Sequence, residues 1–143
     1  MLAEHRSIAV FRALARDVAE ASVLPAAARL VLRMADDERR HAATCADVAR
    51  ALGGAPRLPA RDPRGPVRLA RHPGCSPDER ALRNVVYATC LSETIAAARL
   101  TPTLERTEND LLRRTTRSIL ADEVVHARFG FDYLDAARPW LES

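Results

Sequence analysis

One spacing occurs twice in this chain and constrains its fold more than any other feature. Glu38 is followed three residues later by His41, and Glu123 is followed three residues later by His126. Residues three apart lie on one face of an α-helix, about one turn apart, so each pair brings a carboxylate and an imidazole toward one point. Each pair is therefore half of a metal site, and two copies are far less expected by chance than one.

Each Glu-x-x-His pair also has a lone glutamate upstream. Glu4 precedes the first pair and Glu93 precedes the second. If each lone glutamate and its pair lie at the same depth of an antiparallel helix hairpin, the turns fall near residues 21 and 108. Both places carry residues that start helices, namely Ser22 and Pro25 at the first and Asn109 at the second. The sequence therefore predicts two helix hairpins with the same layout.

The composition favours helix throughout and a single domain over residues 1–143. A chain of 143 residues with only five Gly and few aromatics is typical of one helical core. Its formal net charge is +3, and the basic residues are all Arg, interspersed with acidic ones. A nucleic-acid-binding protein usually gathers basic residues on one face together with stacking aromatics. Nucleic acid is therefore not an expected partner.

Membrane attachment and disulfides are not expected either. The chain opens without a signal pattern, and no apolar run approaches the roughly 20 residues that a membrane span needs. We therefore expect a cytoplasmic location. Cys45, Cys75 and Cys90 form no CxxC pair. An odd number of cysteines in a reducing compartment favours free thiols.

Four helices are expected from the spacing of apolar residues and from start and stop signals. The predicted ranges are 2–21, 25–52, 77–105 and 109–137, with a Pro- and Arg-rich crossover over 53–76 that travels the length of the bundle. Ser76 is expected to cap the third helix and Pro139 to end the fourth. Pro102 is expected either to kink the third helix or to end it early, and the symmetry of the two hairpins favours the kink. The predicted fold is all-α: a four-helix bundle of two antiparallel hairpins joined by a long crossover.

Four Glu and two His fall on the inward faces of these helices, where no Arg accompanies them. An unpaired buried carboxylate costs several kcal/mol even after relaxation, so something positive must lie among them. Metal cations are the economical answer, and the alternative is a repeat of polar residues that face solvent or form internal ion pairs. A carboxylate and imidazole set suits Fe or Mn better than a structural zinc site. Asp37 and Asp122 each precede a Glu of a repeated pair. Each is expected to accept a hydrogen bond from a ligand His on the neighbouring helix.

On these residues the chain resembles the ferritin-like di-iron carboxylate superfamily, which includes bacterioferritin and rubrerythrin. That family places a lone Glu on two helices and Glu-x-x-His on two others, all projecting into the core. The matching positions here are Glu4, Glu38, His41, Glu93, Glu123 and His126. The resemblance implies two Fe ions, with Mn as the alternative, bridged by Glu38 and Glu123 and bound terminally by Glu4 and Glu93. Residues 2–7 and 90–94 also resemble uncharacterised bacterial ferritin-like domain proteins.

The resemblance implies activation of O2 or peroxide, and three functions stay open. The first is an oxidase or oxygenase acting on a small-molecule substrate. The second is Fe(II) oxidation or peroxide scavenging without an organic substrate, and the third is a metal-stapled structural or interaction bundle. The sequence has no Cys-rich rubredoxin module for electron delivery and only four residues after Pro139, which favours soluble redox chemistry over storage in a cage.

Several residues near the expected site keep two interpretations. Cys45 and Cys90 lie about one turn from a ligand, and a small buried hydrophobe is a simpler interpretation of each than a redox group. Tyr133 is either an electron or proton relay or, more simply, a core aromatic. Glu4 lies so near the start of the chain that we expect one end of the site to open to solvent or to be covered by a partner subunit. A homo-oligomer is expected only on general grounds.

Overall fold

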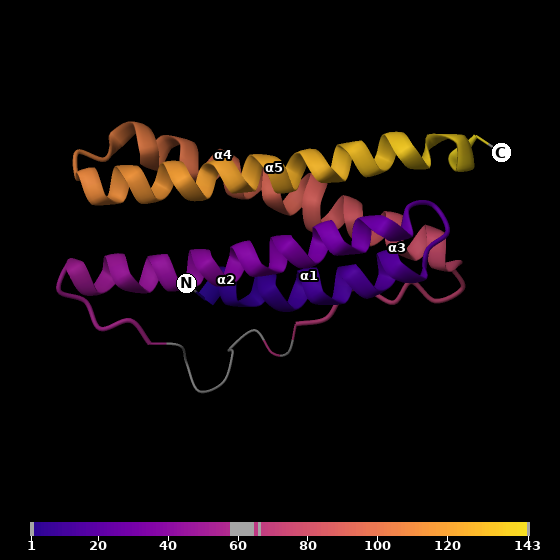
Figure 1. Cartoon of the computed structure of the whole chain (residues 1–143), viewed down its shortest axis with the longest axis horizontal. Coiled ribbons are helices and arrows are strands. Elements are labelled where there is room, and N and C mark those ends of the chain that lie inside the picture. The colour runs from indigo at the N-terminus through magenta and orange to yellow at the C-terminus, as the bar shows by residue number, and fades with distance from the viewer. Residues whose placement is uncertain (1, 58–64, 66, 143) are drawn as a thin grey trace.

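The computed structural model describes residues 2–57, 65 and 67–142, and the predicted all-α bundle is confirmed. A π-helical segment, Val86–Leu91, joins α3 to α4, so these two helices form one continuous rod and the bundle has four rods (Figure 1). The central part of the predicted crossover, residues 58–64 and 66, lies outside the described residues. The α-helices of the described part are α1 (Leu2–Glu20), α2 (Ala28–Ala51), α3 (Pro77–Val85), α4 (Ser92–Arg106) and α5 (Asp110–Leu141).

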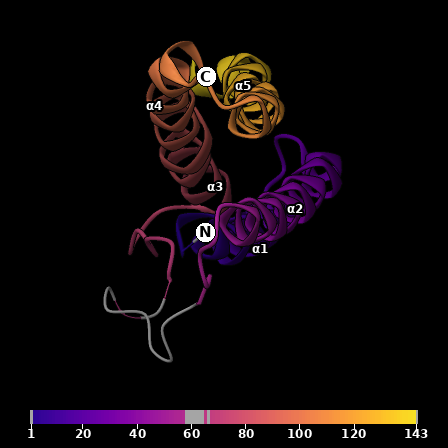
Figure 2. The same cartoon turned by 90° about the vertical axis from the view of Figure 1, so that its left-hand side faces the viewer.

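The rods pair as two hairpins. α1 packs along α2, and α4 packs along α5 (Figure 1). Seen end-on, the α1–α2 pair and the α4–α5 pair form two layers, and α3 slopes from the upper layer down to α1 (Figure 2). α2 also contacts α5, which brings the two Glu-x-x-His helices together. No helix within 2–57 and 67–142 is both long enough and apolar enough to cross a membrane.

The apolar core lies where α1, α2 and α3 meet. Phe11, Leu14 and Val18 of α1 follow the three- and four-residue steps of one helix face and are fully buried. They pack with Val31 of α2 and Val85 of α3 in one cluster. Each such burial stabilises the fold by roughly 1.5–3 kcal/mol. This cluster holds the first hairpin and α3 together beside the polar group described below.

Two helix starts use side-chain caps. Ser76 Oγ accepts a hydrogen bond from the Glu79 backbone N–H at 3.1 Å, as expected for the start of the third helix. Asn109 Oδ1 accepts one from the Leu112 backbone N–H, also at 3.1 Å. Each cap satisfies a backbone donor that has no partner inside its helix.

The prediction that Pro139 ends the fourth helix is wrong. α5 continues through Pro139 to Leu141. Proline lacks the backbone N–H and its ring crowds the preceding turn, but the last turn of the helix still closes from Glu142 N–H to Arg138 O at 3.1 Å. Pro102 also lies inside its helix, since α4 continues to Arg106. A proline near the end of a helix therefore marks the boundary only to within a turn.

Candidate metal centre

Five of the six predicted ligands meet in the middle of the bundle. Glu38 and His41 come from α2, Glu93 from α4, and Glu123 and His126 from α5. All five are buried, with Glu38, His41 and His126 each only 1% exposed. Buried carboxylates at this density require a compensating positive charge.

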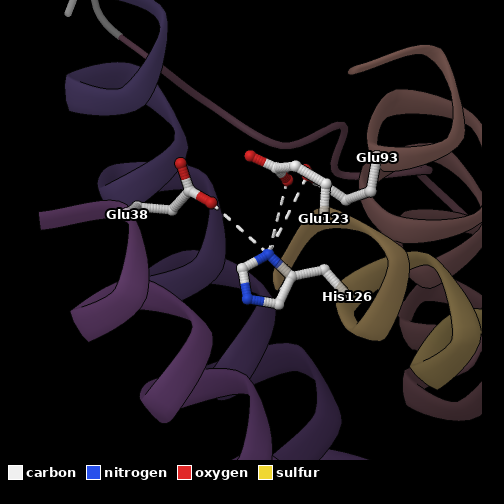
Figure 3. Close-up of side chains that lie close together, drawn as sticks. All are labelled: Glu38, Glu93, Glu123 and His126. Atoms are coloured by element: carbon white, nitrogen blue, oxygen red, sulfur yellow. Dashed lines mark ion pairs between the residues drawn. The ribbon is translucent and has the colours of Figure 1, made fainter. Parts of the chain in front are cut away.

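The side chains converge on one small region. Glu38, Glu93, Glu123 and His126 each offer one ligand atom, and these atoms all lie within 4.8 Å of one another (Figure 3). Ligands bound to one ion at about 2.1 Å lie up to about 4.2 Å apart, so small side-chain shifts bring these atoms to bonding distance. His41 Nδ1 joins the group from the other side, at 3.5 Å from Glu123 Oε1.

Both imidazoles point Nδ1 toward the buried glutamates and Nε2 toward an aspartate outside this group. His41 Nε2 lies 3.0 Å from Asp122 Oδ2, and His126 Nε2 lies 3.2 Å from Asp37 Oδ2. Each pair joins α2 to α5, so each aspartate faces the histidine of the neighbouring helix. Because a carboxylate only accepts, the neutral ring carries its proton on Nε2 and presents the Nδ1 lone pair to the site.

Four buried atoms of the group have no hydrogen-bond partner among the described residues. They are Glu38 Oε1, His41 Nδ1, Glu123 Oε2 and His126 Nδ1. The contacts between imidazole nitrogens and carboxylate oxygens, such as 3.4 Å from His126 Nδ1 to Glu38 Oε1, are longer than an ordinary hydrogen bond but short enough for charge attraction. Unpaired donor atoms that face one point fit a metal ion.

Arg40 fixes both aspartates, a role that sequence reasoning missed. Its Nη2 lies 2.6 Å from Asp37 Oδ1, and its Nη1 lies 3.1 Å from Asp122 Oδ2. The guanidinium therefore bridges α2 and α5 on the outside of the site. Half of the Arg40 side chain is exposed, as for an ordinary arginine on the solvent face of a helix. The only available signal was its three-residue spacing from Asp37.

The electrostatics show how strongly the group favours positive charge. Burial raises the pKa of Glu93, and the nearby carboxylates of Glu123 and Glu38 raise it further, to about 10. Burial alone would lower the pKa of His126, but the carboxylates of Glu123, Glu38 and Asp37 raise it to about 10. Burial would likewise raise the pKa of Glu123, yet its contacts with the two histidines lower it. Without a cation, the group holds extra protons, and a metal ion would replace them.

The π-helical segment and one glycine position Glu93. Val85 and Cys90 are both buried although they lie five residues apart, a step that an α-helix would turn to different sides. α5 approaches this segment closely at Gly130, where a Cβ atom would lie 2.2 Å from Thr89 Oγ1 and 2.9 Å from the Cys90 backbone nitrogen. The extra residue of the π segment sets the register in which Glu93, on the next turn, enters the site.

The sixth predicted ligand, Glu4, does not join the converging group. It lies in the first turn of α1 and is partly exposed, and its ligand role stays a prediction. Of the other flagged residues, Cys90 is buried and Cys45 is partly buried. Tyr133 is 1% exposed, and no hydrogen bond to its hydroxyl is found in the described part of the chain. Phe11 of the apolar core also contacts His126 edge-on, at 5.5 Å between ring centres.

Comparison with known proteins gives one match. The family model described as Rubrerythrin matches residues 1–131, which is most of the chain. No curated protein and no solved structure matches. The matched range includes all six predicted ligands and both aspartates.

Proposed function

Because the chain belongs to the rubrerythrin family, a group of ferritin-like di-iron carboxylate domains, we propose that it binds two Fe ions and activates O2 or peroxide. We further propose that it uses this chemistry to oxidise a small organic substrate. The observation that carries the proposal is that Glu38, Glu93, Glu123 and His126 each bring a buried ligand atom within 4.8 Å of the others, with the unpartnered Nδ1 of His41 beside them.

The donor set suits Fe, with Mn as the alternative. Three carboxylates and two imidazoles are oxygen and nitrogen ligands, and a thiolate-rich or purely tetrahedral site is not what they form. Glu38 and Glu123 face each other across the helix pair with a histidine on either side, which supports a bridging role for these two carboxylates. When bound, the metal ions would supply the electrons and the Lewis acidity that activate O2 or peroxide.

The chain's own residues hold the ligands in place. Asp122 accepts a hydrogen bond from Nε2 of His41, and Asp37 accepts one from Nε2 of His126. The proton of each neutral ring therefore stays on Nε2, and the Nδ1 lone pair points into the site. Arg40 holds both aspartates at once. Burial keeps bulk water from the carboxylates and strengthens their interaction with a cation. Glu4, in the first turn of α1, is proposed as the sixth ligand from the less enclosed side.

A cavity next to the site supports an organic substrate. It lies between α2 and α5, has a volume of about 300 Å³, and is walled largely by apolar side chains. Leu30, Met34, Val125 and Phe129 supply most of its apolar surface. The charged side chains that also line it are Arg33, Asp37, Arg128 and Asp132, and His126 borders it. A space of this size and polarity suits a small, mainly apolar molecule.

Oxygen and peroxide consumption by the Fe(II)-loaded protein tests the proposal. The expected result is a single stoichiometric turnover that then stalls, and that resumes when a small apolar compound is supplied together with a chemical reductant that returns the iron to Fe(II), but not with the reductant alone. Sustained turnover of Fe(II) alone would instead indicate scavenging without an organic substrate. A metal-dependent rise in melting temperature with no oxidant consumed would indicate a structural bundle. Glu93→Gln should abolish consumption, whereas Glu105→Gln, on an exposed position of the same helix, should leave it unchanged.

A further inference from the structure

A second concave site lies at the other end of α1 from Glu4. A hollow of about 920 Å³ opens between α1 and the returning part of the crossover, residues 67–71. Arg16 on its α1 wall is about 18 Å along the helix from Glu4. The charged side chains that line it are Arg16, Asp17, Glu20, Arg68, Arg71 and Arg80.

Four arginines and two carboxylates line this hollow, and Arg80 is paired with both carboxylates. Arg80 Nε lies 3.1 Å from Asp17 Oδ1, and its Nη2 lies 2.5 Å from Glu20 Oε2. The other three, Arg16, Arg68 and Arg71, make no hydrogen bond or ion pair with any described residue. All three are exposed, so solvent screens their mutual repulsion, but the four arginines exceed the two carboxylates and leave the hollow with a net positive charge that an anion would offset.

The crossover wall is held in place, so the hollow is preformed. Asn84, which is buried, donates through Nδ2 to Ala70 O at 3.1 Å and to Asp17 Oδ2 at 2.7 Å. Its Oδ1 lies 3.2 Å from His72 Nε2. Leu69 packs against the apolar core. Arg68 and Arg71 therefore project from a fixed segment, and little ordering is needed when a ligand binds.

We propose that this arginine-lined hollow binds a small, multiply charged phosphorylated molecule. Guanidinium groups form paired hydrogen bonds with phosphate oxygens, and several of them together match an anion of high charge. The volume exceeds what one inorganic phosphate fills, so a molecule with two or more phosphate groups fits best. The site is independent of the metal centre and does not depend on the proposed oxidase activity.

Titration of the full chain with pyrophosphate, followed by calorimetry at fixed ionic strength, tests this site. Arg16→Gln/Arg68→Gln removes one unpaired guanidinium from each wall and should weaken binding by about tenfold or more. Arg114→Gln/Arg117→Gln removes the same charge from exposed positions of α5 and should change the affinity by less than about twofold. Metal content is measured before and after, because pyrophosphate also chelates metal ions.

A variant with the opposite effect sharpens the test. Glu20→Gln frees Arg80 from one carboxylate and removes a repelling charge from the hollow, so pyrophosphate should bind about threefold or more tightly. Equal weakening in the two arginine pairs would show attraction to net charge alone and overturn the proposal. Unchanged binding in all variants would overturn it as well. Preference for a single-stranded oligonucleotide over pyrophosphate at equal phosphate concentration would replace it with a nucleic-acid surface.

Discussion

At the scale of single residues, Arg40 connects the two histidines of the candidate metal centre through their aspartates. Arg40→Gln removes the bridge between Asp37 and Asp122 and leaves both carboxylates free to turn toward solvent. Loss of such supporting contacts typically costs about 10–100-fold in metal affinity. We predict a weakening of Fe(II) binding in this range, measured by competition with a chelator.

The adjacent arginine provides the matched control. Arg39 forms an equivalent pair with Asp36 at 2.5 Å, but both side chains are exposed and neither faces a histidine. Arg39→Gln should bind Fe(II) as the wild type does. Equal losses in the two variants would show that surface charge, and not the bridge, explains the effect of Arg40.

The raised pKa values of Glu93 and His126 predict how the metal-free protein responds to pH. Both pKa values are about 10 in the folded protein, against ordinary values of 4.5 and 6.5. The folded state therefore binds more protons than the unfolded state between pH 6.5 and about 10, and the free energy of unfolding falls as pH rises through this window. The slope is at most about 1.4 kcal/mol per pH unit for each group.

Urea unfolding of the metal-free protein at pH 7 and pH 9 measures this slope. Glu93→Gln should flatten it, because the amide mimics the protonated carboxyl and does not titrate. Bound metal displaces the same protons, so metal affinity should rise with pH. A metal-free stability that increases from pH 7 to pH 9 would contradict the assigned charges.

Residue spacing along the chain made most of the site predictable. The rest depends on contacts between helices, which the sequence does not display. The three-residue step within Glu38–His41 and Glu123–His126 is local, so the sequence displays it directly. The contacts of Asp37 and Asp122 with the opposite histidines were also expected, since each precedes a ligand. Arg40 was missed because an exposed arginine on a helix is ordinary, and its bridge depends on how closely α2 and α5 approach.

At the scale of elements, the π-helical segment and α5 fit together through Gly130. In an exposed helix, Gly→Ala stabilises by up to about 1 kcal/mol. Here the added methyl group would lie 2.2 Å from Thr89 Oγ1 and 2.6 Å from Cys90 Sγ, so the substitution should destabilise the fold instead. We predict that Gly130→Ala lowers the free energy of unfolding by about 1–3 kcal/mol, the usual cost of overpacking, measured by urea unfolding.

A second substitution identifies the cause. Adding Thr89→Ala to Gly130→Ala removes the nearest clash and should recover part of the loss, although the Cys90 backbone nitrogen at 2.9 Å remains in the way. The two helices should also shift apart, so Gly130→Ala should bind metal more weakly through Glu93. Stabilisation by Gly130→Ala would contradict the close packing of α5 on the π segment.

The same elements show where sequence periodicity stops being informative. The three- and four-residue spacing of apolar residues does not reveal a π segment. One inserted residue changes the register of the helix, and no proline or glycine marks the place. Pro139 gave the opposite error, because α5 accommodates it within the last turn and continues to Leu141. The π segment, in contrast, packs against Gly130 of α5, a tertiary contact that local preference does not display.

At the scale of the whole molecule, the repeated motif was sufficient to predict the bundle. Two hairpins of equal layout, each with a lone glutamate and a Glu-x-x-His pair, bury their polar residues only if the hairpins face each other. The structure shows this arrangement for the α2–α5 contact, and the family match supports it. The sequence predicted Glu4 as a sixth ligand but not its partial exposure, because burial of the first turn of α1 depends on tertiary packing.

Metal content per chain after Fe(II) reconstitution tests the central claim most directly. The wild type should bind about two Fe per chain, and Glu38→Ala/Glu123→Ala should lose them while keeping its helical circular dichroism, because removing two buried carboxylates also removes their repulsion. Glu105→Ala/Glu108→Ala, at exposed positions, should retain both ions. No stoichiometric Fe or Mn in the wild type, or equal metal in the Glu38/Glu123 variant, would contradict the di-iron centre.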